Sequence, residues 1–258
     1  MRSRGLAILW LLSLFAWAVF APHAGMDLSH LLEAPTARAI LGTDAFGRSL
    51  FSALGEAIGR SLSFALITTS AAIGFGVGVG GFLGILQGRV RYFLERVLDF
   101  FLAFPPMLLA LAVQAELGQG WRSLGFSIAM GLFPGVVRFV GSRAREIALS
   151  EYVASAHALG GTPWGLFVRH YSPDLLEHLR LKFPSLFAQA LLLEATLSFL
   201  NLGVPPGVVS WGSLLAQAKE YLIEAPHIAW VVGPPLVLTL LSLQSLIDDA
   251  ARIRPKNF

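Results

Sequence analysis

The run of residues 61–88 contains no charged side chain, and it limits the possible fold more than any other feature of the sequence. As an α-helix this run would extend about 42 Å at ~1.5 Å per residue, which exceeds the roughly 30 Å hydrocarbon core of a bilayer. The composition agrees, because 55% of the 258 residues are hydrophobic and 14% are charged, whereas soluble domains average about 25% charged residues. The sequence therefore predicts an all-α polytopic membrane protein.

Five further apolar stretches are long enough to be considered as membrane spans. Together with the first they predict about six spans, at residues 5–21, 61–88, 100–115, 123–142, 184–203 and 228–247. Pro134 and Pro184 predict kinks or helix boundaries, and the Gly233-Pro234-Pro235 run predicts irregular first turns in the last span. The first span also has the Arg2 and Arg4 flank of a signal peptide. An uncleaved anchor is favoured, because Pro22 would directly follow the expected cleavage site.

The distribution of lysine and arginine predicts the orientation of the chain in the membrane. With the N-terminus inside, the cytoplasmic segments hold 14 of the 19 basic residues, as the positive-inside rule requires. The chain is therefore expected to lie in the inner membrane of the cell, with both termini in the cytoplasm. The expected organisation is an anchor at 1–22, an outer loop at 23–60 and a core at 61–250 with a cytoplasmic loop at about 143–183.

Glycines recur in the predicted span 61–88. Gly74 and Gly78, like Gly80 and Gly84, are four residues apart and share a helix face. Such small residues let another helix approach closely. A packing seam within this chain is favoured over a face that contacts another subunit.

The loop at 143–183 is rich in helix-capping residues. Ser150, followed by Glu151, can start a helix that ends at Gly160. Thr162-Pro163 and Ser172-Pro173 repeat the arrangement of a capping residue followed by proline. Short helices of this kind suit docking into a groove of a soluble partner. The alternative is an amphipathic helix that rests on the membrane surface.

The run Glu151–Gly160, followed by Arg169–Asp174, resembles the coupling loop of binding-protein-dependent ABC importer permeases. The resemblance implies that this loop contacts an ATPase subunit, through Glu151, Ala154, Ser155, Ala156, Gly160, Thr162, Pro163 and Pro173. Positions 154–156 correspond to the Glu-Ala-Ala element of that family. Position 154 is alanine where the family usually has glutamate. The resemblance therefore does not imply the polar contact that this glutamate would make to the partner.

Further stretches resemble the second permease subunit of dipeptide, oligopeptide and nickel importers. They are Leu41–Ser49, Leu102–Pro106, Glu194–Pro206 and Ser210–Gly212. With the coupling loop, the resemblance covers residues from about 40 to 250 and implies the type I ABC importer permease fold. It also implies that the chain translocates dipeptides or oligopeptides, with nickel or another small solute as the alternative.

The resemblance assigns ATP hydrolysis to other subunits, and the sequence agrees. A phosphate-binding loop of the Gly-x-x-x-x-Gly-Lys-Ser/Thr type is absent, and no glycine precedes any of the three lysines. The chain is therefore expected to be no enzyme and to bind no cofactor, with ATP and magnesium used by its partners. The implied partners are a homologous second permease subunit, two ABC ATPase subunits, an extracytoplasmic substrate-binding protein and membrane lipids.

Two further sets of residues are candidate functional residues. Thr43, Asp44, Gly47 and Arg48 are expected to form a turn that faces the substrate-binding protein. A loop that closes over the outer helix ends is favoured there over direct contact with substrate. Glu194 is the one acid in an otherwise apolar span, so it should face protein or water. A structural role for Glu194 is favoured over a role in the translocation path.

Other classes of function fit the sequence less well. Cysteine is absent, and the six histidines show no spacing typical of a metal site, so no metal site is predicted. A net charge of +3 without a dense basic patch argues against a nucleic-acid partner. A membrane enzyme would need a catalytic motif. A proton- or sodium-driven carrier, the remaining alternative, would need several intramembrane acids or inverted repeats.

Overall fold

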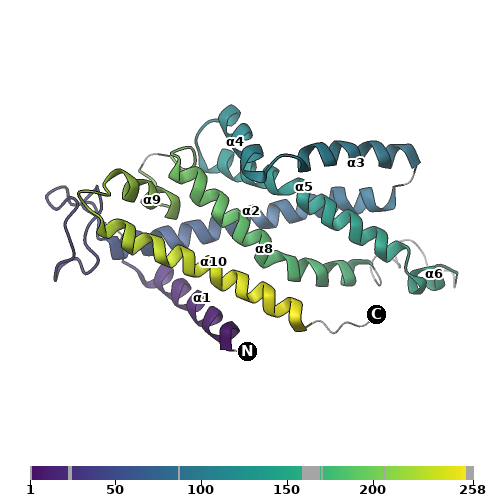
Figure 1. Cartoon of the computed structure of the whole chain (residues 1–258), viewed down its shortest axis with the longest axis horizontal. Coiled ribbons are helices and arrows are strands. Elements are labelled where there is room, and N and C mark those ends of the chain that lie inside the picture. The colour runs from purple at the N-terminus through teal and green to yellow at the C-terminus, as the bar shows by residue number, and fades with distance from the viewer. Residues whose placement is uncertain are drawn as a thin grey trace.

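The computed structural model describes residues 2–22, 25–86, 88–158, 169, 171–205 and 207–253. The described helices are α1 (Arg2–Phe20), α2 (Leu50–Ile85), α3 (Gly88–Leu102), α4 (Pro106–Leu117), α5 (Trp121–Ala148), α6 (Glu151–Ala158), α8 (Ser172–Phe199), α9 (Trp211–Glu220) and α10 (His227–Ile253). They form an elongated bundle with residues 25–49 at one end and α6 at the other (Figure 1). Within the described residues β-pairing is limited to one isolated bridge, between Thr43 and Ser49, so the predicted all-α class is confirmed.

Each of the six predicted spans falls on a helix or on a bent pair of helices. By length and apolar composition, α2, α5 and α10 can each cross a membrane, and α3 with α4 can form a fourth, broken span. The apolar helix α1 is shorter. The first part of α8 carries Asp174, Glu177, Arg180 and Lys182, which lower its apolar character.

The third predicted span, at 100–115, is wrong as a single helix. Helix α3 ends at Leu102, helix α4 begins at Pro106, and the two are bent by 87°. The cause is the Pro105-Pro106 pair, since proline lacks an amide donor and disfavours helical geometry in the residue before it. Pro105 accordingly has an extended backbone with ψ 137°.

Several predicted boundaries also differ from the structure. Helix α2 begins at Leu50, ahead of the predicted span at 61–88, and α8 begins at Ser172, where Ser172-Pro173 predicts a helix leading into the span at 184–203. Helix α5 extends into the predicted inner loop 143–183 as far as Ala148. Missing charges mark where a helix can enter lipid and do not mark where it ends. Helix α2, for example, carries the ion pair Glu56–Arg60 in its first turns, a spacing that itself favours helix.

Three of the helices continue across proline. Pro134 lies inside α5 and Pro184 inside α8, so neither is a helix boundary. The prediction of irregular first turns in the last span is wrong, because α10 remains helical through Pro234 and Pro235. Packing by neighbouring helices and polar side chains makes proline tolerable in membrane helices. In α10, for example, the Thr239 hydroxyl donates to the Pro235 carbonyl at 2.7 Å.

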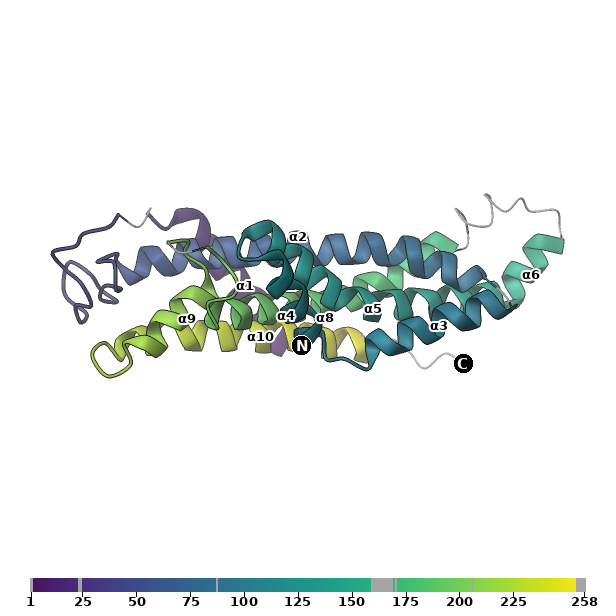
Figure 2. The same ribbon diagram turned by 90° about the horizontal axis from the view of Figure 1, so that it is seen from above.

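Helices α2 and α5 run side by side along the bundle (Figure 2). Their contact is lined by Gly76, Gly80 and Gly84, where a Cβ atom would lie 2.3–2.8 Å from atoms of α5. The predicted seam within the chain is therefore present at Gly80 and Gly84. Gly74 and Gly78 are not part of it, because a Cβ atom there would meet nothing within 4 Å.

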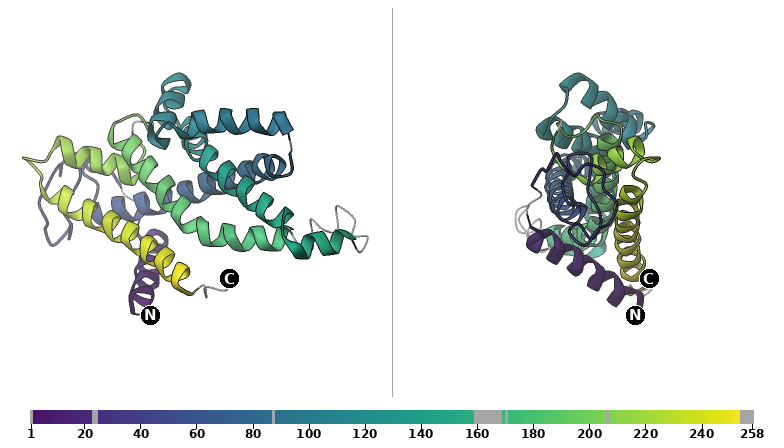
Figure 3. Two further views of the ribbon diagram at one scale, coloured as in Figure 1. Left: turned by 45° about the vertical axis from the view of Figure 1, so that its right-hand side comes forward. Right: turned by 90° about the vertical axis from the view of Figure 1, so that its left-hand side faces the viewer.

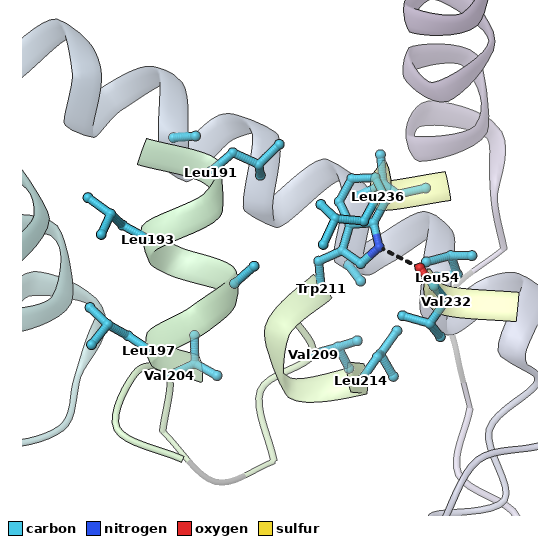
Figure 4. Close-up of a cluster of buried hydrophobic side chains, with 14 of the residues drawn as sticks. Leu54, Leu191, Leu193, Leu197, Val204, Val209, Trp211, Leu214, Val232 and Leu236 are labelled. Atoms are coloured by element: carbon cyan, nitrogen blue, oxygen red, sulfur yellow. Dashed lines mark hydrogen bonds between the residues drawn. The ribbon is translucent and has the colours of Figure 1, made fainter. Parts of the chain in front are cut away.

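The largest core cluster surrounds Trp211, the first residue of α9 (Figure 4). Its indole is fully buried among Leu54 and other side chains of α2, α8 and α10, and Nε1 donates to the Val232 carbonyl at 3.1 Å. Helix α1 packs on α10 and α2 (Figure 3). Trp10 Nε1 donates to Thr239 Oγ1 at 3.2 Å, which joins α1 to α10.

Candidate functional site

The short helix α6 lies at the extreme end of the bundle, beyond the last turn of α5 (Figure 1). Val153 is 4% exposed and packs into a cluster that contains Ile147 of α5 and Leu175 and Leu179 of α8. Through this buried side chain, α6 joins a cluster that includes residues of α5 and α8.

The opposite side of α6 faces away from the bundle. Glu151, Tyr152 and Ser155 are exposed, and Ala156 is half-buried. Glu151 lies in the first turn of the helix, where its negative charge interacts favourably with the positive end of the helix dipole. The result is a short helix with one anchored side and one open side, which suits insertion into a groove of a partner.

The structure places the remaining residues of the predicted coupling loop as follows. Gly160, Thr162 and Pro163 lie outside the described residues, as does the side chain of Ala154. Ser150 directly precedes α6, at the position where the sequence predicts a cap, and its hydroxyl donates to the Ile147 carbonyl at 2.6 Å.

At the start of α8 the capping expectation is displaced by one residue. Ser172 is the first residue of the helix instead of its cap, and Pro173 follows it in the first turn. Proline is well tolerated there, because the first amides of a helix have no partner within it.

At the other end of the bundle, Asp44 and Arg48 are buried inside the outer segment. Asp44 is 0% exposed and Arg48 is 3% exposed. Arg48 Nε and Nη2 each lie 2.7 Å from Asp44 Oδ2. The amides of Phe46 and Arg48 donate to Oδ1 at 2.9 Å each. A buried charge pair is stable only when its remaining hydrogen-bonding positions are filled, and this carboxylate meets that condition.

Thr43 and Gly47 complete the same turn. The Thr43 hydroxyl donates to the His30 carbonyl at 2.7 Å and accepts from the Glu33 amide at 2.8 Å. Gly47 has φ +71°, and a Cβ atom on it would lie 1.8 Å from the Asp27 carbonyl oxygen, so only glycine fits. The four residues therefore form a turn, and the buried side chains of Thr43, Asp44 and Arg48 shape the segment instead of presenting themselves at its surface.

The tertiary structure shows contacts of two histidines, His30 and His227, that the sequence did not predict. His227, at the start of α10, lies 3.3 Å from the Thr43 carbonyl through Nε2 and joins the outer segment to the bundle. The Nδ1 atom of His30 lies 2.7 Å from Glu33 Oε1. This hydrogen bond raises the pKa of His30 above its usual value. The His30-x-x-Glu33 spacing was the one sequence signal for the second contact.

Glu194 is completely buried in α8. Its Oε1 accepts a hydrogen bond from the Ser198 hydroxyl at 3.0 Å. The hydroxyls of Ser61 and Ser210 also lie near the carboxylate, although Oε2 has no well-formed hydrogen bond to the described residues. The carboxylate thus faces protein, as the cost of a charge in lipid requires.

A polar cluster of Ser61, Glu194, Ser198 and Ser210 joins three helices. Ser61 of α2 accepts the Trp211 amide at 3.0 Å. Ser210 caps α9, because its hydroxyl accepts the Ser213 amide at 3.2 Å while the Ser213 hydroxyl accepts the Ser210 amide at 2.8 Å. Glu194 therefore lies where α2, α8 and the start of α9 meet, which supports a structural role.

Comparison with known proteins identifies the family. Residues 76–248 match the family described as binding-protein-dependent transport system inner membrane component. The chain is 30% identical to the glutathione transport system permease protein GsiD of Pectobacterium atrosepticum, over 97% of this chain and 84% of that protein. It is 28% identical to the dipeptide transport system permease protein DppC of Alkalihalophilus pseudofirmus, over 98% of this chain and 86% of that protein. The chain therefore belongs to the family of inner-membrane permease components of binding-protein-dependent transport systems.

Proposed function

We propose that this chain is a transmembrane permease subunit of an ATP-driven ABC importer that moves small peptides across the inner membrane. The observation that carries the proposal is the family match over residues 76–248, which includes α6 and Glu194 with its neighbours Ser198 and Ser210. The relatives named for glutathione and dipeptide transport favour peptides over nickel as the substrate class.

The proposed assembly contains a homologous second permease subunit, two ABC ATPase subunits and an extracytoplasmic substrate-binding protein. This chain contributes the membrane path, while ATP and magnesium are bound by the ATPase subunits. The proposal keeps both termini cytoplasmic, because 14 of the 19 lysines and arginines then lie inside. In this orientation α6 faces the cytoplasm and residues 25–49 face the outside.

In the proposed mechanism, α6 is the coupling helix. Its exposed side, with Glu151 and Ser155, would lie in a groove of an ATPase subunit. Closure of the ATPase subunits on ATP would displace α6. Because Val153 packs with Ile147 and Leu175, the displacement would be passed to α5 and α8. Rocking of the long helices would then expose a central path to one side of the membrane at a time.

The outer segment is proposed to contact the substrate-binding protein through the surface that its buried turn supports. Leu28, Ile40 and Phe46 are exposed there. The Asp44–Arg48 ion pair fixes the turn beneath Phe46, and the Arg48 guanidinium lies 4.8 Å from the centre of that ring. Substrate contact through the buried side chains is not part of the proposal.

Reconstitution tests the proposed function directly. The chain, the second permease subunit and the two ATPase subunits are placed in proteoliposomes with the substrate-binding protein. Uptake of labelled dipeptide, glutathione and Ni²⁺ is then measured with and without ATP. We expect ATP-dependent peptide uptake, which is lost when the phosphate-binding lysine of the ATPase subunits is replaced. Uptake driven by a pH or sodium gradient without ATP would contradict the proposal.

A further inference from the structure

A cavity of about 480 Å³ lies between α3 and α5 in the part of the bundle nearest α6. Most of its lining is charged, an unusual property for a cavity between two membrane helices. The charged residues are Arg91, Glu95, Arg96 and Asp99 of α3 and Arg138, Arg145 and Glu146 of α5. Neither the family match nor the proposed transport mechanism assigns a role to this cavity.

The ion pairs around the cavity leave positive charge uncompensated. Asp99 is shared by two arginines, with Arg138 Nη1 at 2.6 Å from Oδ1 and Arg96 Nη1 at 3.4 Å from Oδ2. Arg145 forms no ion pair with the described residues although it lines the cavity.

The other acids do not change this balance. Glu95 forms an ion pair with Arg91, whose Nε and Nη2 atoms lie 2.9 and 2.7 Å from Glu95 Oε1. Glu146 is paired with Arg143, which lies on the same helix just outside the cavity. Four arginines and three carboxylates line the cavity, and Arg143 outside it neutralises Glu146. With Arg143 included, five arginines are set against three carboxylates, which leaves a net charge of +2 for an anion.

The cavity lies near the end of α5 and the start of α3. Arg145 is three residues before the end of α5, and Arg91 is three residues after the start of α3. Arg138 lies ten residues before the end of α5, which places it about 15 Å from that end of the helix. In the proposed orientation this end is cytoplasmic. Arginine side chains of this length can extend from within the membrane to the headgroups.

The other face of α3 is apolar and uncovered in this chain. Val90, Phe93, Val97 and Phe100 are 40–66% exposed, whereas Leu98 is the one buried residue recorded for this helix. A charged face toward α5 and an apolar face outside it fit an amphipathic ligand. A free phosphate ion would use the charged cavity but would gain nothing from the apolar face.

We propose that the cavity binds the headgroup of an anionic phospholipid of the cytoplasmic leaflet, with the acyl chains lying along the apolar face of α3. Arginine is suited to this role, because its planar guanidinium can bind a phosphate through two parallel hydrogen bonds. Basic pockets between membrane helices on the cytoplasmic side bind anionic headgroups in this way. The inference uses the proposed orientation but depends on neither the substrate nor the coupling helix.

Lipid titration of the assembled transporter tests the inference. The transporter is purified in a neutral detergent and titrated with fluorescent phosphatidylglycerol, and with phosphatidylcholine for comparison. We expect preferential binding of phosphatidylglycerol, and Arg145→Gln should weaken it roughly fivefold. Because Arg145 forms no ion pair with the described residues, this variant should fold normally. Arg145→Lys, which keeps the charge, should restore much of the affinity.

The matched control is Arg122→Gln, which removes an exposed arginine from the opposite end of α5 and should leave the affinity unchanged. Equal affinity for the two lipids, or equal loss in the two glutamine variants, would overturn the proposal. Complete displacement of the lipid by millimolar sodium phosphate would instead assign the cavity to a free anion. Binding by the isolated chain that disappears on assembly would assign this face to the second permease subunit, and would equally overturn the proposal.

Discussion

Two nitrogens of Arg48, Nε and Nη2, each lie 2.7 Å from Oδ2 of Asp44, and the pair is buried inside the outer segment. The second oxygen of Asp44 is occupied by two backbone amides. The pair therefore determines the local backbone as well as balancing its own charge. The turn it holds is tied to the bundle where His227 approaches the Thr43 carbonyl.

Asp44→Ala should strongly destabilise the outer segment, because it leaves the Arg48 guanidinium buried without its partner. Removing one member of a buried pair costs about 3–5 kcal/mol. The double variant Asp44→Ala/Arg48→Met should recover part of this loss, since it no longer buries an unpaired charge. Thermal unfolding of the purified transporter, followed by tryptophan fluorescence, measures both effects. A double variant as unstable as the single one would show that the charge pair is not the cause.

Glu194→Gln should retain near-normal expression and uptake, because the amide oxygen can still accept the Ser198 hydrogen bond. Glu194→Leu should lower stability by about 1–3 kcal/mol, since it leaves buried serine hydroxyls without a partner. Uptake per folded transporter separates structure from transport. Loss of uptake in a well-expressed, stable Glu194→Gln variant would place this residue in the translocation path instead.

Gly80→Ala should destabilise the contact between α2 and α5, because the new Cβ atom would lie 2.8 Å from the Val137 carbonyl oxygen. Gly78→Ala is the matched control on the same helix, since its Cβ atom would meet nothing within 4 Å. The control should be neutral or gain up to about 1 kcal/mol from improved helix propensity. The two thermal midpoints measure the difference, and equal midpoints would argue against the glycine seam.

His30 should make the stability of the outer segment depend on pH. Its hydrogen bond to Glu33 raises the pKa of His30, so the folded state favours the protonated ring. The stabilisation is complete below the ordinary histidine pKa of about 6.5 and disappears as pH rises through the raised folded-state value. The difference in thermal midpoint between the wild-type chain and His30→Gln should thus shrink from pH 5.5 to 8. A difference that grows with pH would contradict the assignment.

Gly160→Trp should uncouple ATP hydrolysis from peptide uptake, because the resemblance places this small residue in close contact with the ATPase subunit. ATPase activity should persist while uptake falls by an order of magnitude or more. Gly5→Trp, at an exposed glycine with no neighbour within 4 Å of a new Cβ atom, should leave both activities unchanged. Normal uptake by Gly160→Trp would remove the assigned role of this loop.

The sequence predicted six spans, of which three helices and one bent pair are long and apolar enough to cross a membrane in the described residues. These could be predicted because a span depends mainly on local composition. The absence of charge in residues 61–88 is sufficient to place a span there, whatever surrounds it. The boundaries were less accurate, since α2 and α8 continue through charged residues outside the apolar core. The Pro105-Pro106 break was visible in the sequence, but the 87° angle that follows it depends on how α4 packs on α5.

By itself, the sequence determined the all-α membrane class and the short motifs that carry the family resemblance, and it predicted the approximate positions of the apolar helices. Only the tertiary structure decided that Gly76 joins Gly80 and Gly84 against α5, and that Glu194 lies beside Ser61 and Ser210. The reason is physical: hydropathy is a property of each segment, whereas these contacts depend on the rotation of each helix about its axis and on the choice of its neighbours.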